Sequence, residues 1–227
     1  MTYDRDGNVV RRAARMLREE ADSYRPSAEL PWRLHRTPYR VFLAEFLLVR
    51  TRSDVVARVF EQIFSRYPAV SALAGAHQGD LRDALRPLGL PKRVPYLLRA
   101  ARYLMEQHDG EIPRTVEELM QVPGLGLYTA VAIAAFAYGS AEVPADVNVL
   151  RLLSRLTGMP MSHPTRGSNE LRALLPHVSR DVGGPEAEDL LDFSRLVCRP
   201  RRPLCEECPL TPYCDYRARH QRRGVGS

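Results

Sequence analysis

The chain of 227 residues contains a single lysine, Lys92, and the rest of its 33 lysine and arginine residues are arginine. This scarcity restricts the chemistry, because a mechanism that needs a side-chain amine has only Lys92 to use. Long apolar runs are also missing, so no segment offers the roughly 18 apolar residues that a membrane span needs. The first twenty residues are charged throughout and lack the apolar core of a signal peptide. The sequence therefore predicts a soluble, cytoplasmic protein with no membrane partner.

Strand patterns are nearly absent from the chain. Apolar residues recur instead at spacings of three and four, which predicts α-helices and an all-α fold. The expected helices are 9–23, 38–48, 54–66, 70–74, 78–85, 93–107, 116–120, 128–137, 147–155, 168–177 and 185–197. Ser53 and Thr115 are expected helix caps, Thr115 in a capping box with Glu118. The tail from Arg217 to Ser227 is expected to fray.

Cysteine is confined to one window near the C-terminus, at Cys198, Cys205, Cys208 and Cys214. Four thiolates so close together are typical of a cofactor cage, and both a cubane iron–sulfur cluster and a tetrahedral zinc ion take four cysteine ligands. A reducing compartment suits free thiolates better than disulfides. The surrounding segment is rich in arginine, and the whole chain carries a formal charge of +6. This balance favours a nucleic-acid partner.

A glycine-rich turn, Val-Pro-Gly-Leu-Gly at 122–126, separates two predicted helices. Gly124 and Gly126 permit a tight turn with uncovered N–H groups, and the following helix adds the positive end of its dipole. Such a turn can hold a phosphate, although most P-G-x-G sequences taken singly only join two helices. About twenty residues later, Asp146 opens a predicted helix after Pro144, where capping is the ordinary role of an aspartate.

The order of these features, P-G-x-G, an aspartate at a helix start and four closely spaced cysteines, resembles the helix-hairpin-helix (HhH-GPD) DNA glycosylase superfamily with an iron–sulfur loop. The resemblance runs from about Pro38 to Arg217. It implies two helical domains flanking a DNA-binding cleft: a six-helix domain with the hairpin over 28–138, and a discontinuous cluster domain of 1–27 plus 139–227. It also implies that the cysteines hold a [4Fe–4S] cluster rather than zinc.

Position 128 indicates the branch of the superfamily. Endonuclease III-type members, which cut the DNA backbone, carry a lysine two residues after the second hairpin glycine as a Schiff-base nucleophile. Tyr128 stands there in this chain, where the MutY branch usually has serine. Tyrosine, together with the segments 47–51, 146–148 and 191–194, is similar to the thymine/uracil mismatch glycosylase (MIG) branch. The resemblance thus implies a monofunctional glycosylase, without strong AP-lyase activity, that removes thymine or uracil opposite guanine.

Two other functions stay open. One is removal of adenine, as in the MutY branch, or of another modified base. The second is a non-catalytic DNA-binding role on the same scaffold. The expected partner is double-stranded DNA with a mismatched or damaged base, bound by a monomer associated with the nucleoid.

The resemblance also implies catalytic roles for three residues. Asp146 is the expected carboxylate that stabilises the cationic sugar or activates the attacking water. Glu45 lies in an apolar run and is expected to hydrogen-bond the extruded base, the alternative being a helix residue turned to solvent. Tyr128 is expected to pack against the sugar or base, the alternative being ordinary helix packing.

DNA contacts are expected from a second set of residues. Gly124 and Gly126 would hold a phosphate through main-chain amides. Arg50 matches the position that fills the hole left by a flipped base, and Lys92 would probe the opposite strand; both have a solvated surface charge as the alternative. Asn148 would fix the geometry at the helix start or touch a phosphate.

Overall fold

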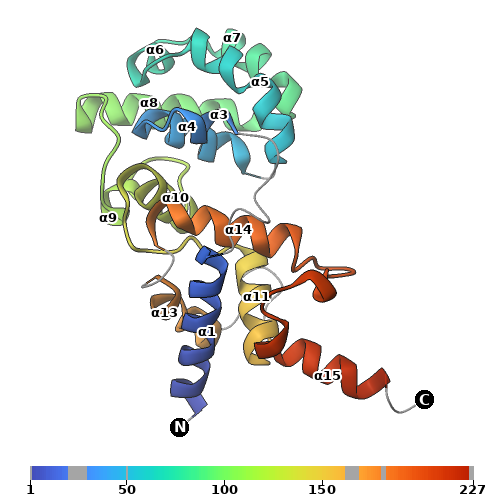
Figure 1. The fold of residues 1–227 in the computed structure, drawn as a ribbon. Helices are drawn as coiled ribbons and strands as arrows, with labels where there is room; N and C mark the ends of the chain where they lie inside the picture. Colours follow the sequence, from blue (N-terminus) through green and yellow to red (C-terminus); the bar gives the residue numbers. More distant parts are fainter. Residues whose placement is uncertain (1, 20–29, 50, 162–168, 180–182, 225–227) are drawn as a thin grey trace. The chain divides into compact units, whose positions relative to one another are not determined.

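The computed structural model describes residues 2–19, 30–49, 51–161, 169–179 and 183–224, and the regular structure in these residues is helical throughout (Figure 1). The expected all-α fold class is confirmed. Among the helices described, none combines the length and the apolar character that crossing a membrane requires.

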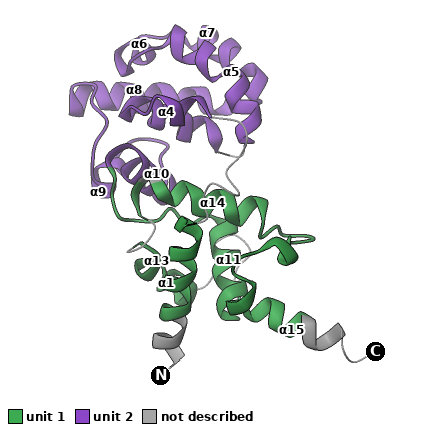
Figure 2. Cartoon of the chain, in the orientation of Figure 1, with its two compact units in different colours: residues 1–27, 139–227 green, residues 28–138 purple. Residues whose placement is uncertain are grey.

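The chain divides into two compact units (Figure 2). Unit 1 comprises residues 1–27 and 139–227, and unit 2 comprises residues 28–138. The hairpin glycines, Glu45 and Lys92 belong to unit 2, whereas Asp146, Asn148 and the four cysteines belong to unit 1.

Unit 2 is built around two helices that are apolar on nearly all sides. These helices, α4 (Pro38–Leu48) and α10 (Leu127–Tyr138), pack against each other, as a helix without a polar face must. The others are α3 (Pro31–Leu34), α5 (Ser53–Arg66), α6 (Val70–Ala74), α7 (Gln78–Leu85), α8 (Val94–His108) and α9 (Val116–Leu119), with the 3₁₀ turns η1 (Arg86–Leu88) and η2 (Pro91–Arg93). Helix α8 packs on α6 and α7 through its apolar face.

Unit 1 is built around α1 (Thr2–Glu19), α11 (Val147–Thr157) and α14 (Ala187–Leu196), which pack on one another. The C-terminal helix α15 (Asp215–Gly224) packs on α11. The remaining elements are α12 (Asn169–Arg172), α13 (Leu175–Ser179), η3 (Gly184–Glu186), η4 (Cys205–Glu207) and η5 (Thr211–Tyr213). Helix α11 therefore lies at the centre of the unit that carries the cysteines.

Of the two expected helix caps, the structure has the one at Thr115 and lacks the one at Ser53. Thr115 caps α9, because its Oγ1 accepts a hydrogen bond from the Glu118 N–H at 3.3 Å. The expected cap at Ser53 is wrong, since α5 begins at Ser53 itself and Arg52 occupies the cap position. Asp54 in the first turn pairs with the Arg52 guanidinium at 3.0 Å, and its carboxylate places a negative charge at the positive end of the helix dipole.

The single helix predicted over 168–177 is also wrong, because the structure has two short helices, α12 and α13, within the described part of that segment. Pro176 is the second residue of α13 and has no N–H to donate to the preceding turn. A continuous helix would lose a hydrogen bond there. Residue 168 lies outside the described residues.

The tail that was predicted to fray is helical as far as Gly224. Two side-chain pairs hold successive turns of α15 together: Asp215 and Arg219 form an ion pair at 2.5 Å, and the rings of Tyr216 and His220 lie 3.9 Å apart. The predicted fraying is therefore corrected for the described residues.

Candidate functional site

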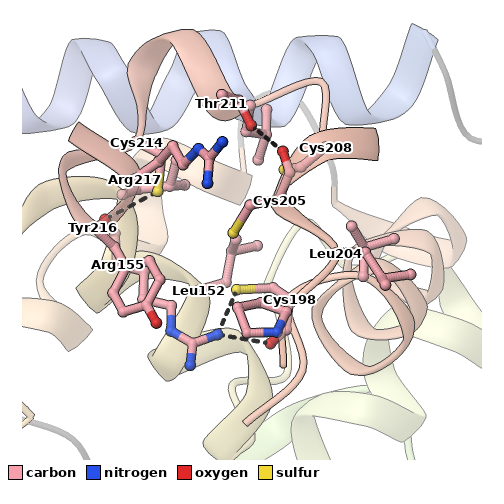
Figure 3. Close-up of a pocket in the computed structure, with 14 residues that line it drawn as sticks. Leu152, Arg155, Cys198, Leu204, Cys205, Cys208, Thr211, Cys214, Tyr216 and Arg217 are labelled. Atoms are coloured by element: carbon pink, nitrogen blue, oxygen red, sulfur yellow. Dashed lines mark hydrogen bonds between the residues drawn. The ribbon is translucent and has the colours of Figure 1, made fainter. Parts of the chain in front are cut away.

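The four cysteines are free and line one hollow of unit 1, with about 360 Å³ of empty space when the part open to solvent is included (Figure 3). Tight turns bring them there, since η4 begins at Cys205 and ends just before Cys208, and η5 ends just before Cys214. Cys198 follows α14 and is buried. Leucine, valine and proline side chains make up much of the remaining lining.

Burial raises the pKa of three of these thiols, Cys205, Cys208 and Cys214, and raises that of Cys208 to about 11. Neighbouring groups act in the opposite direction: the Leu210 N–H lowers the pKa of Cys208, and the charge of Arg217 lowers that of Cys205. A thiol with a raised pKa keeps its proton at neutral pH. Binding of a metal centre must displace these protons and is favoured as the pH rises.

The two candidate cofactors both take four cysteine ligands, but they need different distances between the sulfur atoms. Within the described residues, no three His, Cys, Asp or Glu side chains lie close enough together to share one metal ion. A zinc ion bound at about 2.3 Å by four thiolates would need sulfur atoms about 3.8 Å apart. A cubane cluster takes one thiolate on each of its four irons, so the sulfur atoms lie farther apart. Four free cysteines at one hollow supply the four thiolates that a [4Fe–4S] cluster needs, and a cluster held by all four would cross-link the loop.

Asp146 is the N-cap of α11, with φ −84° and ψ 179°. Its Oδ1 accepts hydrogen bonds from the main-chain N–H groups of Asn148 and Val149, at 2.8 and 2.9 Å. Its Oδ2 accepts from Asn148 Nδ2 at 2.6 Å. The ordinary capping role is thus confirmed. Three donors hold the partly exposed carboxylate in one orientation and stabilise its charge.

A chain of hydrogen bonds joins this carboxylate to the cysteine loop. Asn148 Oδ1 accepts from Arg151 Nη1 at 3.0 Å. Arg151 in turn donates to the carbonyls of Cys198, at 2.9 Å, and of Ser194, at 2.8 Å. The sequence analysis did not identify Arg151. The available signal was an arginine pair, 151 and 155, spaced four apart on a helix whose other face is apolar.

The hairpin of unit 2 has the geometry that its glycines predict. Gly124 has a φ of 89°, and a Cβ there would lie 3.2 Å from Phe46 Cζ and 3.2 Å from Tyr96 Cβ. A side chain at this position would have a strained backbone conformation and would lie too close to both neighbours. A Cβ at Gly126 would meet open space, and its carbonyl accepts the Ala130 N–H at 2.9 Å. No side chain therefore lies over Gly126, the residue immediately before helix α10.

The other expected residues of unit 2 lie on elements next to this hairpin. Glu45 is 7% exposed on α4, so the alternative in which it turns to solvent is wrong. The following residue, Phe46, contacts the Gly124 position, and its carbonyl accepts Arg93 Nη1 at 3.0 Å. Arg93 belongs to η2, in which Lys92 is exposed. Unit 2 thus brings together the end of α4, the turn with Lys92 and the hairpin.

Tyr128 and Arg50 are the two remaining residues with an expected role. Tyr128 lies in the first turn of α10 and is 37% exposed. Arg50 lies outside the described residues.

These features define an iron–sulfur protein of the helix-hairpin-helix type. Residues 43–177 match the model of the HhH-GPD superfamily base excision DNA repair protein. Residues 198–214 match the iron–sulfur binding domain of endonuclease III. The chain belongs to the HhH-GPD superfamily of base excision DNA repair proteins, and its cofactor is a [4Fe–4S] cluster.

Individual proteins are similar over most of the chain. A thymine-DNA glycosylase of Aeropyrum pernix is 35% identical over 195 residues, which cover 83% of this chain and 86% of the relative. An adenine DNA glycosylase of Mycolicibacterium smegmatis is 32% identical over 194 residues, covering 84% of this chain and 65% of the relative. The solved structure of a thermostable thymine-DNA glycosylase has the same fold, with a TM-score of 0.80 at 24% identity over 96% of this chain and all of that one.

Proposed function

We propose that this protein is a monofunctional DNA glycosylase that hydrolyses the N-glycosidic bond of thymine or uracil mispaired with guanine in duplex DNA. The observation that carries the proposal is the Asp146 carboxylate, which three N–H donors hold at the start of α11. The 35% identity to a protein named thymine-DNA glycosylase supports the choice of base.

Asp146 supplies the chemistry that this reaction needs. The departing base leaves a sugar with positive charge at C1′, and a fixed carboxylate stabilises that charge more than it stabilises the neutral substrate. The same oxygen atoms can orient or deprotonate the attacking water. Asn148 acts as a positioning residue, because its side chain contacts both Asp146 and Arg151.

Residues of unit 2 supply recognition. Glu45 is a buried carboxylate in the otherwise apolar stretch 41–48 of α4, a suitable partner for the N–H edge of an everted thymine or uracil. Gly124 and Gly126 are exposed, and their main-chain amides are assigned to a backbone phosphate. Lys92 is assigned to the opposite DNA strand. Arg50 is assigned to the place in the base stack that the flipped base leaves.

A panel of mispaired duplexes tests the proposal. We expect free thymine from G·T and free uracil from G·U, with an abasic site that breaks only after treatment with alkali. Release of adenine opposite guanine or 8-oxoguanine would favour the alternative that the 32% identity to an adenine DNA glycosylase supports. Tight binding to mismatched DNA without release of any base would identify a non-catalytic DNA-binding protein.

The lack of a lysine at position 128 yields a prediction about lyase activity. We expect Tyr128→Lys to form a covalent adduct with abasic DNA that borohydride traps, because an amine there would attack C1′ and form a Schiff base. The unchanged protein should form none, since its single lysine lies in η2.

Tyr96→Lys is the matched control, because Tyr96 is also an exposed tyrosine of unit 2, at 47%. Adduct formation by the unchanged protein would contradict the monofunctional assignment. Equal amounts of trapped adduct from both lysine variants would show that position 128 does not lie nearer to C1′ than position 96 does.

A further inference from the structure

Arg155 contacts the cysteine loop more extensively than its place near the end of α11 would suggest. Its Nη1 lies 3.4 Å from Cys198 Sγ and 3.3 Å from the Cys198 carbonyl oxygen, and it donates to the Arg199 carbonyl at 2.7 Å. Its Nη2 donates to the Pro200 carbonyl at 3.1 Å. One guanidinium thus holds three consecutive residues that begin with the first cysteine.

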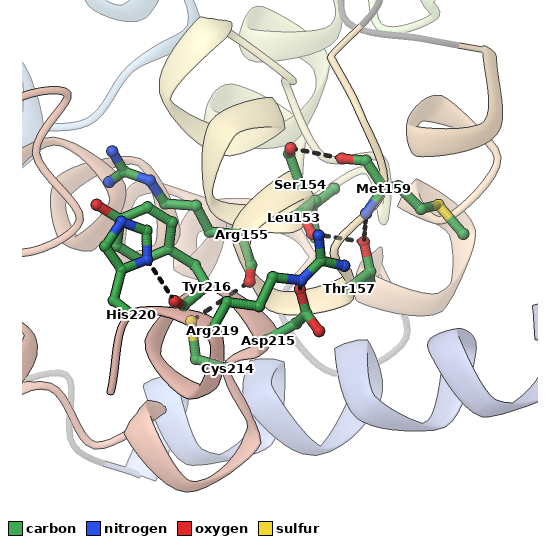
Figure 4. Close-up of polar contacts among 10 residues, drawn as sticks. All are labelled: Leu153, Ser154, Arg155, Thr157, Met159, Cys214, Asp215, Tyr216, Arg219 and His220. Carbon is green, nitrogen blue, oxygen red and sulfur yellow. Dashed lines mark hydrogen bonds and ion pairs between the residues drawn. The ribbon is translucent and has the colours of Figure 1, made fainter. Parts of the chain in front are cut away.

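The same residue also meets the last cysteine of the cage. Cys214 Sγ lies 3.3 Å from the Arg155 carbonyl oxygen (Figure 4). At its distance from Cys198 Sγ, the Arg155 guanidinium N–H can donate a charge-assisted hydrogen bond to a ligand sulfur that carries negative charge. The side chain of Arg155 therefore favours the ligated form of the cage.

The Tyr216 ring covers this guanidinium on one side. The Arg155 Cζ lies 4.7 Å from the centroid of the Tyr216 ring, and the centroids of the Tyr216 and His220 rings lie 3.9 Å apart (Figure 4). The His220 ring nitrogen Nδ1 lies 2.8 Å from the Tyr216 carbonyl oxygen, which fixes this stack on α15. A covered cation is screened less by solvent and acts more strongly on a nearby charge.

We infer that Arg155 is a positioning residue of the iron–sulfur site: its guanidinium stabilises the charge on the Cys198 sulfur, which raises the reduction potential of the cluster and slows the loss of iron. Reduction adds one electron and hence negative charge to the cluster, so a fixed cation beside a ligand sulfur favours the reduced form. Anchoring of residues 198–200 opposes the opening of the loop through which iron would leave.

The test uses the full-length protein with its cluster and needs no DNA substrate. For Arg155→Gln we expect release of iron to a chelator to be about tenfold faster. Loss of a group that hydrogen-bonds a metal ligand typically lowers metal affinity by about 10- to 100-fold, and this expectation takes the lower end of that range. We also expect a more negative potential by voltammetry, where a tenfold loss of preference for the reduced form corresponds to about 59 mV. Arg155→Lys, which keeps the charge but not the planar fork, should lie between this variant and the parent.

Arg199→Gln is the matched control, because it removes an exposed arginine next to Cys198 whose Nε donates only to the Leu196 carbonyl, at 2.7 Å, among the contacts described. It should match the parent in both measurements. The inference is overturned if Arg155→Gln also matches the parent, or if Arg199→Gln shifts the potential as far. If Arg155→Gln is obtained without its cluster, Arg155→Lys and Tyr216→Leu decide, and a parental potential in both overturns it.

Discussion

Asp146→Asn is expected to slow base release by about 10²- to 10⁴-fold, the range lost with a positioned acid or base, while DNA affinity stays near that of the parent. The amide keeps Oδ1 and with it the two main-chain hydrogen bonds of the helix cap. Asparagine caps helices as well as aspartate does, so thermal stability should also be retained. What the variant removes is the negative charge beside the sugar. Single-turnover release of thymine from a G·T duplex measures the effect.

Asp146→Asn also disturbs the contact between residue 146 and the Asn148 side chain, and this second effect needs its own control. Its amide NH₂ would face Asn148 Nδ2, another donor, at the place where Asp146 Oδ2 now accepts at 2.6 Å. Asn148→Ala separates the two effects, because it removes this contact and the one to Arg151 while the carboxylate stays. We expect a loss of about tenfold, the size of one hydrogen bond to a charged group, about 1.5 kcal/mol. If Asp146→Asn retained full activity, the proposed role of the carboxylate would be wrong.

The helices that the sequence located correctly are those whose ends are fixed locally. The segments 38–48, 70–74 and 78–85 have the predicted bounds. Local signals mark some of these ends, since Pro38 begins the first segment and Gly75 follows the second. Errors arose where a single residue or a distant partner decides. Pro176, in the first turn of α13, disfavours one continuous helix with α12, and the contacts of α15 with α11 order a tail whose composition alone indicates fraying.

The cage and the contacts around it were predictable to different degrees. The spacing of the cysteines alone indicated a four-thiolate site, since the ligands are close in sequence. Arg151 and Arg155 reach the Cys198 loop from positions 43 to 47 residues away, and nothing in the local pattern specifies that long-range pairing. Their side chains find the loop carbonyls only once α11 and α14 have packed.

Removal of a cluster ligand is the other change expected to have a large effect. Cys208→Ala should yield protein with little iron, weak visible absorption and a loss of stability of more than about 4 kcal/mol in unit 1, because metal binding contributes directly to folding free energy. The loop from Cys198 to Cys214 buries Leu210 as its only fully apolar anchor among the residues described. Such a loop has little apart from its cofactor and hydrogen bonds to hold it folded.

Loss of the loop should extend to Asp146, which makes the expected effect of Cys208→Ala larger than local disorder. Without a fixed Cys198 carbonyl, Arg151 loses one of its two main-chain acceptors and Asn148 loses its rigid neighbour. Base release should therefore fall together with iron content. Glu207→Ala is the control, because Glu207 is an exposed residue of the same turn and should keep iron, melting temperature and activity. Full iron content and parental melting in Cys208→Ala would contradict the four-thiolate assignment.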